Sequence, residues 1–440
     1  MRRSTFLKSL ALGTASVATG SAYAKTHSTA TAPPVLPQGA QTPPNGQLQH
    51  GNPTTQQPNH PTTDTPTTGT PTTRNPEITA VEAFAFKKAC FVCVTADDGT
   101  KGWGEANHDT PLITAQVIND RLAKRIVGEP VWDSAEVGKE LYFKEEDLGN
   151  TGLLPGCIAG IDNALWDLKG KLVGQPVHHL LGGNGERRFR AYGSFGRGFG
   201  RKQKSDAELV KLALDFVDKG YEVLKVRMQI RQLNVDPFPD DTYASVKAVA
   251  EAIPDDVQLM VDFNNGYTPA QAIRIGKRLV DDFGIVALEE PISYQNYDGL
   301  AEVADALPIA IAAGEHEYNR WQYRDLITRG NPALLNLDVI KACGISECFA
   351  VAQMGWAFDK YVMVHNARPT LQTAASVALL GSIPNAFHVQ EHAGERPELG
   401  LNHLFESMPR FEDGYLYVSE APGVGLEVRE DLVRKEALNT

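Results

Sequence analysis

The second half of the chain contains short apolar runs of two to four residues, separated by longer stretches with helix start and stop signals. Continuous apolar runs of this length are typical of strands buried on both faces, as in parallel sheets. Strands that alternate with helices predict repeated βα units. With a first run at Phe189–Tyr192 there are eight strands, which matches one (β/α) TIM-type barrel of the (β/α)7β kind. The others are Val223–Leu224, Leu259–Val261, Val286–Leu288, Ile309–Ala312, Leu334–Leu337, Tyr361–Val364 and Phe387–Val389.

Two of the predicted barrel helices are marked at both ends. Ser205 and Glu208 have the spacing of a capping box before an apolar periodic segment, which Gly220 closes. Thr268-Pro269 places a cap and a proline at a helix start, and Gly284 ends that helix.

The residues before the barrel have a different pattern. Apolar and polar side chains alternate over Glu77–Phe86 and again over Cys90–Thr95, which predicts strands. Helical periodicity follows through about 112–180. We therefore expect an α+β capping domain at 77–185, the barrel at 186–395, and a segment at 396–440 that completes the capping domain. A strand pattern in 411–428 predicts a hairpin that returns to that domain.

The N-terminal region has the features of an export signal and a linker. Residues 1–24 have a basic start with Arg2-Arg3, a weakly apolar middle and a small-residue cleavage site, which resembles a twin-arginine signal. An ordinary secretory signal is the alternative. Residues 25–76 are rich in proline and threonine, which predicts a disordered linker or, alternatively, a glycan-bearing stalk. We expect export to the periplasm or cell envelope of a bacterium, and no later segment reaches the roughly 18–20 apolar residues of a membrane span.

Charge and cysteine content narrow the function classes. A formal charge of −12 and a pI near 5.4 argue against nucleic acid as a partner, because phosphate binding needs clustered cationic surface.

The five cysteines have no disulfide or metal spacing. Cys90 and Cys93 lie three apart on a predicted strand, so they point to opposite faces and are expected to be buried thiols.

Ionisable residues follow the predicted barrel strands at nearly constant spacing. From Asp262 to Glu391 they are 23 to 27 positions apart, about the length of one βα unit. The C-terminal ends of barrel strands converge on one face, where active sites lie. The positions are Lys225, Arg227, Asp262, Glu289, Glu315, Asp338, His365 and Glu391.

Three of these positions predict a metal site. Asp262, Glu289 and Glu315 would repel one another strongly in one cleft unless a cation lay between them. Ligands that offer only oxygen favour a hard ion, Mg²⁺ or Mn²⁺. The alternative is that each acid caps a helix or pairs with an arginine. By strand alternation, Glu290 is expected to point to the opposite side from Glu289.

The remaining positions predict acid–base chemistry. Asp338 can fix the tautomer of His365 and raise its basicity, which makes an acid/base dyad. Glu391 could donate a hydrogen bond to a substrate oxygen if the cleft raises its pKa. Lys225 and Arg227 face the same side and could neutralise a bound carboxylate. Lys225 could instead act as a base if desolvated, whereas Arg227 keeps its proton.

A set of motifs in fixed order is similar to that of the enolase superfamily, in its mandelate racemase and muconate lactonizing enzyme branch. The resemblance covers 77–430, and the motifs are specific when they occur together. The capping domain contributes Gly102-Trp-Gly-Glu105, Gly160–Gly170 and Gly174–Gly183, and the barrel contributes Lys225-Val-Arg227, Val261–Asn264, Glu289-Glu-Pro291, Gly314-Glu315, Leu337-Asp338, His365-Asn366 and Glu391.

The resemblance implies a shared first step. A Mg²⁺ ion on the three acids binds the substrate carboxylate, a base removes the adjacent proton, and the ion, Lys225 and Glu391 stabilise the enediolate. Lys341 matches a family lysine that supports Asp338. The resemblance also implies a homo-oligomer, and it places specificity in capping-domain loops such as 106–111 and 143–152.

One departure from the family pattern reduces the number of reactions that the resemblance allows. Racemases of this branch usually carry a second lysine as base where this chain has Arg227, so we expect β-elimination rather than racemisation. The stretch from His365 to His392 is similar to that of sugar-acid dehydratases of the galactonate type. Those relatives place a histidine where this chain has Asn264, which argues against galactonate itself as substrate.

We therefore expect a Mg²⁺-dependent dehydratase of an aldonic or aldaric acid. Asn264, Lys341 and Arg368 are expected to help bind substrate, and Arg197 and Arg201 are further candidates. An epimerase or cycloisomerase with the same enediolate is the enzymatic alternative. A secreted carbohydrate-binding relative without catalysis is the alternative from another class.

Overall fold

The computed structural model describes residues 75–183, 187–198 and 203–439. The predicted export signal, the predicted linker up to residue 74, and Arg201 lie outside the described residues. No helix within the described ranges is both long and apolar enough to cross a membrane.

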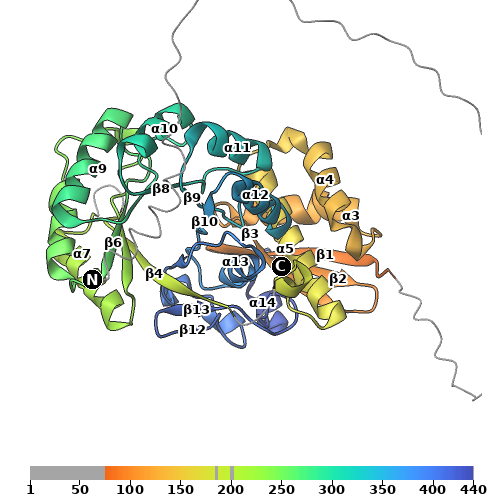
Figure 1. Ribbon diagram of the computed structural model, residues 1–440. Coiled ribbons are helices and arrows are strands. Elements are labelled where there is room, and N and C mark those ends of the chain that lie inside the picture. The colour runs from red at the N-terminus through yellow and green to blue at the C-terminus, as the bar shows by residue number, and fades with distance from the viewer. Residues whose placement is uncertain (1–74, 184–186, 199–202, 440) are drawn as a thin grey trace, which may run out of the picture. The chain divides into compact units, whose positions relative to one another are not determined.

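The first described elements form an antiparallel sheet with helices packed on it, drawn in orange to yellow in Figure 1. The strands pair in the order β1, β2, β3, and the long helix α5 packs against β2 and β3. The elements are β1 (Ile78–Phe86), β2 (Ala89–Ala96), β3 (Lys101–Ala106), α2 (Pro111–Val117), α3 (Ala123–Ile126), α4 (Ser134–Lys144), α5 (Leu153–Val173) and α6 (Val177–Leu180).

Two glycines of β3 let helix α5 cross directly over the strand. A Cβ atom on Gly102 would lie 2.1 Å from the carbonyl oxygen of Ala164, and one on Gly104 would lie 2.4 Å from that of Gly160. These distances are far below van der Waals contact, so only glycine fits. The motif Gly102-Trp-Gly-Glu105 therefore seats the helix on the sheet and fixes the position of Glu105.

The barrel prediction is confirmed. Eight strands run parallel in sequence order, and β11 pairs with β4 to bring the last strand back to the first. Between β10 and β11 the described pairing is a single bridge, Val362 to Ala386. The strands are β4 (Arg188–Gly196), β5 (Val223–Arg227), β6 (Gln258–Asp262), β7 (Ala287–Glu289), β8 (Ala310–Ala313), β9 (Leu334–Leu335), β10 (Tyr361–Val362) and β11 (Val389–His392).

Seven helices alternate with these strands, and several lie on the outer side of the barrel in Figure 1. The predicted end signals are present: Ser205 and Glu208 form the capping box of α7, Pro269 begins α9, and Gly284 ends α9 with φ 62°. The helices are α7 (Asp206–Asp218), α8 (Thr242–Ala252), α9 (Pro269–Phe283), α10 (Tyr297–Ala306), α11 (Arg320–Asp325), α12 (Ile345–Ala357) and α13 (Leu371–Ser382).

The C-terminal segment contacts both parts. Strands β12 (Phe411–Glu412) and β13 (Tyr415–Tyr417) form the expected hairpin, but β13 pairs antiparallel with barrel strand β4. The chain then reaches the capping elements, where the Val424 N–H donates to Asp167 Oδ1 at 2.9 Å. Helix α14 (Glu430–Glu436) continues this contact. Residues on both sides of the hairpin thus meet the capping domain, since the ring centres of Phe91 in β2 and Phe405 lie 5.6 Å apart.

The cysteines behave as small apolar side chains. All five are buried free thiols. Cys90 belongs to the hydrophobic cluster that includes α5, whereas Cys93 belongs to the cluster around Trp103. The prediction that these two residues lie on opposite faces of their strand is confirmed.

Candidate active site

The predicted site residues gather at the C-terminal ends of the barrel strands. Arg227 is the last residue of β5 and lies opposite Asp262, the last residue of β6, which in turn lies opposite Glu289 at the end of β7. The others stand at or just after the ends of the next strands: Glu315 after β8, Asp338 after β9, His365 after β10 and Glu391 within β11.

Lys225 is the buried cation of this cluster. Its Nζ lies 2.5 Å from Glu289 Oε1 and 3.4 Å from Glu391 Oε1, and it sits 5.0 Å from the centre of the Tyr192 ring. Burial alone lowers the pKa of Lys225, but these carboxylates raise it well above its usual value. These contacts suit the predicted role of Lys225 as a positive charge that faces a developing anion, and its alternative role as a base stays a prediction.

Asp262 and Glu289 carry more negative charge than the described side chains neutralise. Burial raises the pKa of Asp262 to about 6 and that of Glu289 to about 7, and repulsion between neighbouring acids adds to both shifts. Glu289 Oε2 is buried with no hydrogen-bond partner among the described residues. An orphaned carboxylate oxygen among acids fits a hard divalent cation, which oxygen ligands favour.

The third acid, Glu315, is turned toward the histidines. Its Oε2 lies 3.4 Å from His365 Nε2, and its Oε1 lies 3.6 Å from His316 Nε2. Among the described residues of this region, Glu290, Glu315 and His316 form a group whose potential metal-ligand atoms all lie within 4.8 Å of one another. Asp262, Glu289 and Glu315 share one end of the barrel, but Glu315 must turn from His365 to share an ion with the other two.

Glu290 does not point to the opposite side as strand alternation predicts. Strand β7 ends at Glu289, and Glu290 has a left-handed backbone with φ 41°. Its Oε1 lies 3.3 Å from His316 Nε2. Burial and the neighbouring Glu315 raise the pKa of Glu290 well above its usual value. The left-handed residue thus adds a fourth acid to the cluster.

The predicted dyad is formed. His365 Nδ1 lies 2.7 Å from Asp338 Oδ2. Burial alone lowers the pKa of His365, but Glu315 and Asp338 raise it to about 9. Lys341 Nζ lies 3.9 Å from both Asp338 Oδ2 and Glu315 Oε1, so it joins the dyad to the acids. This places Lys341 as a support of Asp338.

Glu391 is surrounded by groups that lower its pKa. Burial alone raises its pKa, but Lys225, His365 and the N–H of Asn366, which donates to Glu391 Oε2 at 2.9 Å, lower it overall. A hydrogen bond donated by Glu391 requires a protonated carboxyl group. Glu391 is thus an ion-pair partner of Lys225, and its predicted role as a hydrogen-bond donor stays a prediction.

Two residues proposed for substrate binding are engaged elsewhere. Asn264 donates to both oxygens of Asp262 and accepts the Gln229 N–H, so it orients the acid. Arg368 donates to the carbonyl oxygen of Lys88 in the turn between β1 and β2. Both side chains thus hold other parts of the protein in place, and their predicted role in substrate binding stays a prediction.

The predicted substrate-facing arginines Arg197, which follows β4, and Arg227, which ends β5, have different surroundings. Arg197 Nη2 lies 3.3 Å from Asp241 Oδ2. Arg227 has a buried Nε without a hydrogen-bond partner among the described residues. Arg227 also interacts electrostatically with Asp262 and Glu391, as expected for a residue that shares their end of the barrel.

A chain of hydrogen bonds joins the capping sheet to the dyad, which sequence reasoning did not find. The N–H of Gln372, in α13, donates to Glu105 Oε2 at 3.0 Å, and its Nε2 donates to Asp338 Oδ1 at 3.2 Å. Glu105 also accepts a 2.5 Å hydrogen bond from Thr370. Its place in the motif Gly102-Trp-Gly-Glu105 was visible in the sequence, but its partners lie more than 260 positions away.

The loop 106–111 also reaches this region. Burial lowers the pKa of His108 to about 4, and its remaining interactions are with Arg368, Asp109, Asp338 and Lys341. The loop thus carries a buried histidine that interacts electrostatically with Asp338 of the dyad, and its predicted role in specificity stays a prediction.

Family models and related proteins match most of the chain. The model described as "Enolase C-terminal domain-like" matches residues 208–432, and that of the mandelate racemase / muconate lactonizing enzyme N-terminal domain matches 62–182. The chain is 27% identical over 349 residues to an arabinonate dehydratase of Saccharolobus solfataricus, with 77% of this chain and 87% of that protein covered. It is 28% identical over 352 residues to a D-galactarolactone cycloisomerase of Agrobacterium fabrum, with 77% and 88% covered.

A solved structure supports the same assignment. A mandelate racemase/muconate lactonizing protein of Paracoccus denitrificans, complexed with magnesium, has a TM-score of 0.75 and 30% identity, with 82% of this chain and 98% of that chain covered. The fold, the strand-end residues and the two family models agree. The chain belongs to the enolase superfamily, in its mandelate racemase and muconate lactonizing enzyme branch.

Proposed function

We propose that the protein is a Mg²⁺-dependent dehydratase of an aldonic or aldaric acid, a carbon–oxygen hydro-lyase that forms a 2-keto-3-deoxy acid. The observation that carries this proposal is the 2.7 Å contact between His365 and Asp338, combined with two cations, Lys225 and Arg227, on β5. This arrangement supplies one base, His365, and two separate cationic side chains that can face the substrate carboxylate.

The chain's own residues account for each proton and charge. Asp338 engages Nδ1 of His365, so Nε2 is the nitrogen that takes the proton from the carbon next to the substrate carboxylate once Glu315 has turned away from it and the ring is neutral. The negative charge that develops on the carboxylate oxygens faces Lys225. A divalent cation held by Asp262, Glu289 and Glu315 would supply further neutralisation of that charge.

The elimination needs no second base. His365 returns its proton to the β-hydroxyl, which leaves as water while the carbon–carbon double bond forms. The resulting enol rearranges to the keto acid, so one substrate gives one keto acid and one water. Racemisation would require a base on a second face. Lys225 holds its proton through Glu289 and Glu391, and Arg227 does not give up its proton near neutral pH.

The test is a screen of aldonic and aldaric acids with Mg²⁺ and a keto-acid reagent. We expect turnover of at least one acid, with loss of one water in the product mass. His365→Asn should abolish turnover, and His403→Asn, at an exposed histidine paired with Glu436, is the matched control. Full turnover after exhaustive chelation of divalent ions would contradict the proposal.

A cycloisomerase is the second candidate, supported by the similarity to the D-galactarolactone cycloisomerase. That reaction also begins by removing a proton next to a carboxylate group, but an isomerisation conserves mass. Reaction in D₂O separates the candidates. An isomer of unchanged heavy-atom composition supports the cycloisomerase, and deuterium in recovered substrate without keto acid supports an epimerase.

A further inference from the structure

Two adjacent histidines and a glutamate gather away from the candidate active site. His178 and His179 belong to the short helix α6, and Glu420 follows β13 near the C-terminus. Glu420 Oε1 lies 3.6 Å from His178 Nε2, and Glu420 Oε2 lies 3.7 Å from His179 Nε2. One potential ligand atom of each residue lies within 4.8 Å of the others. These three side chains converge from segments about 240 positions apart.

His178 is the unusual member of this cluster. It is 1% exposed, yet neither ring nitrogen has a hydrogen-bond partner among the described residues. A buried polar atom without a partner is costly and needs an explanation. Both ring nitrogens of His178 are thus free of protein partners, and in the neutral ring one of them offers a lone pair. A neutral imidazole nitrogen is what a metal ion requires as ligand.

His179 is oriented by a neighbour. Its Nδ1 lies 3.3 Å from Oε1 of Gln175, which lies four positions earlier in the connection between α5 and α6. An N–H at Nδ1 that donates to this oxygen leaves Nε2 as the free lone pair, which is the Nε2 that faces Glu420. Histidines that ligate metals in proteins usually donate their other ring nitrogen in this way.

The separations fit a single ion. Ligands about 2.0–2.1 Å from a tetrahedral zinc ion lie about 3.4 Å from one another. The two contacts of Glu420 with the histidines exceed this value by only a few tenths of an ångström. Because the two contacts use different oxygens of Glu420, the carboxylate would bind the ion through both oxygens or rotate to present one of them to both rings.

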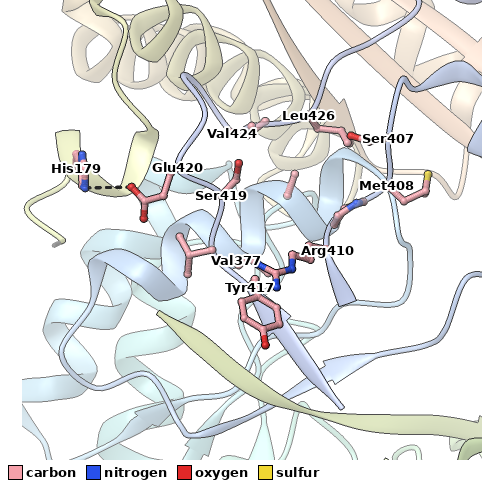
Figure 2. Close-up of a pocket in the computed structure, with 14 residues that line it drawn as sticks. His179, Val377, Ser407, Met408, Arg410, Tyr417, Ser419, Glu420, Val424 and Leu426 are labelled. Atoms are coloured by element: carbon pink, nitrogen blue, oxygen red, sulfur yellow. Dashed lines mark ion pairs between the residues drawn. The ribbon is translucent and has the colours of Figure 1, made fainter. Parts of the chain in front are cut away.

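The cluster has room for a fourth ligand. His179 and Glu420 line a cavity of about 750 Å³, and Figure 2 shows them facing each other at its edge. Helix α13 and the segments 407–410 and 417–426 supply the other walls. None of the candidate active-site residues lines this cavity.

We propose that His178, His179 and Glu420 form a second metal site, which binds a divalent first-row transition ion such as Zn²⁺. Imidazole nitrogens with one carboxylate suit Zn²⁺, whereas Mg²⁺ prefers oxygen ligands. Water from the cavity completes the coordination. The ion would clamp helix α6 to the segment after β13, so its role is to stabilise the C-terminal part of the fold.

The experiment measures Zn²⁺ binding to the full chain after removal of metals, by competition with a chromophoric chelator. Excess Mg²⁺ is present, and Asp262→Asn serves as background, so that zinc at the acidic cluster is recognised. His179→Ala removes a side chain that is 35% exposed, Glu420→Gln neutralises one that is 52% exposed, and both should leave the fold intact. The matched control is His403→Ala, which alters a surface pair in which His403 lies 2.8 Å from Glu436.

We expect one tightly bound Zn²⁺ per chain in the wild type, in Asp262→Asn and in His403→Ala. His179→Ala and Glu420→Gln should each weaken binding at least about tenfold. They should also remove the visible absorption of bound Co²⁺ and the rise in melting temperature caused by Zn²⁺. Equal zinc affinity in these variants and the wild type would overturn the proposal. So would equal losses in His403→Ala and His179→Ala, because that result indicates surface binding only.

Discussion

Asp338→Asn tests whether the dyad sets the basicity of His365. Asparagine keeps the shape of aspartate and can still accept the N–H of Ile340, which donates to Asp338 Oδ1 at 2.9 Å. The charge is lost, and an amide N–H₂ group facing Nδ1 makes that nitrogen an acceptor. The proton of the neutral ring then moves to Nε2, the nitrogen that must act as base.

The size of the effect follows from the pKa of His365. A rise from about 6.5 to about 9 corresponds to about 3 kcal/mol, to which Glu315 makes the largest favourable contribution. Loss of one charge-assisted hydrogen bond removes about 1.5–3 kcal/mol, or about one to two pH units. Because the folded-state pKa is raised, this stability is fully present below about pH 6.5 and is lost as pH rises through about 9.

Three measurements follow. Imidazole NMR on protein stripped of divalent ions should show a lower pKa for His365 in Asp338→Asn. The fall in unfolding free energy between pH 6.5 and 9 should become smaller than in the wild type. Once a substrate is known, kcat should drop on the order of 10³–10⁴-fold, because the ring has the wrong tautomer.

The control is Asp298→Asn, at an exposed aspartate that pairs with Arg329 at 3.0 Å. It makes the same chemical change and should alter none of the three measurements. The reasoning about the dyad fails if Asp338→Asn keeps kcat within about threefold of the wild type with the pKa of His365 unchanged.

Three other predictions concern the metal, the core and pH. We expect Mg²⁺ to raise the melting temperature of the wild type in scanning calorimetry. Asp262→Asn should abolish this rise, whereas Asp298→Asn should keep it. Gly104→Ala should lower the unfolding free energy in urea by about 1–3 kcal/mol or more, because its Cβ meets helix backbone. Gly138→Ala, in the open on α4, should raise it by about 0.5–1 kcal/mol, and equal effects would refute the close packing. Burial raises the pKa of Asp162 from 3.8 to about 6, so about 3 kcal/mol of stability present below pH 3.8 is lost as pH rises through about 6. Asp162→Asn should flatten this slope in denaturation curves, and an unchanged slope would assign it to other groups.

The barrel could be predicted because its strands are buried on both faces and so appear as apolar runs. Their spacing also placed Asp262, Glu289, Glu315, Asp338 and His365 at one end of the fold. Both inferences use only local periodicity and the convergence of parallel strand ends.

The departures arise where local periodicity stops. Glu290 follows the end of a strand with a left-handed backbone, so alternation no longer describes its direction. The lowered pKa of Glu391 depends on the Asn366 N–H and on Lys225, two neighbours whose distances no spacing in the sequence gives. Arg368 reaches a carbonyl group 280 positions away, a partner that only the folded chain supplies.

The path from Glu105 through Gln372 to Asp338 bears on how such proteins can be re-engineered. Grafting a capping domain from a relative onto this barrel would replace Glu105, which holds Gln372 by a hydrogen bond. The orientation of Asp338, and through it that of the proposed base His365, would then change. Chimaeras should therefore work best when Glu105 and the start of helix α13 are transplanted as one unit. Otherwise a chimaera made to change substrate specificity would also change the rate of proton transfer, and the two effects could not be separated.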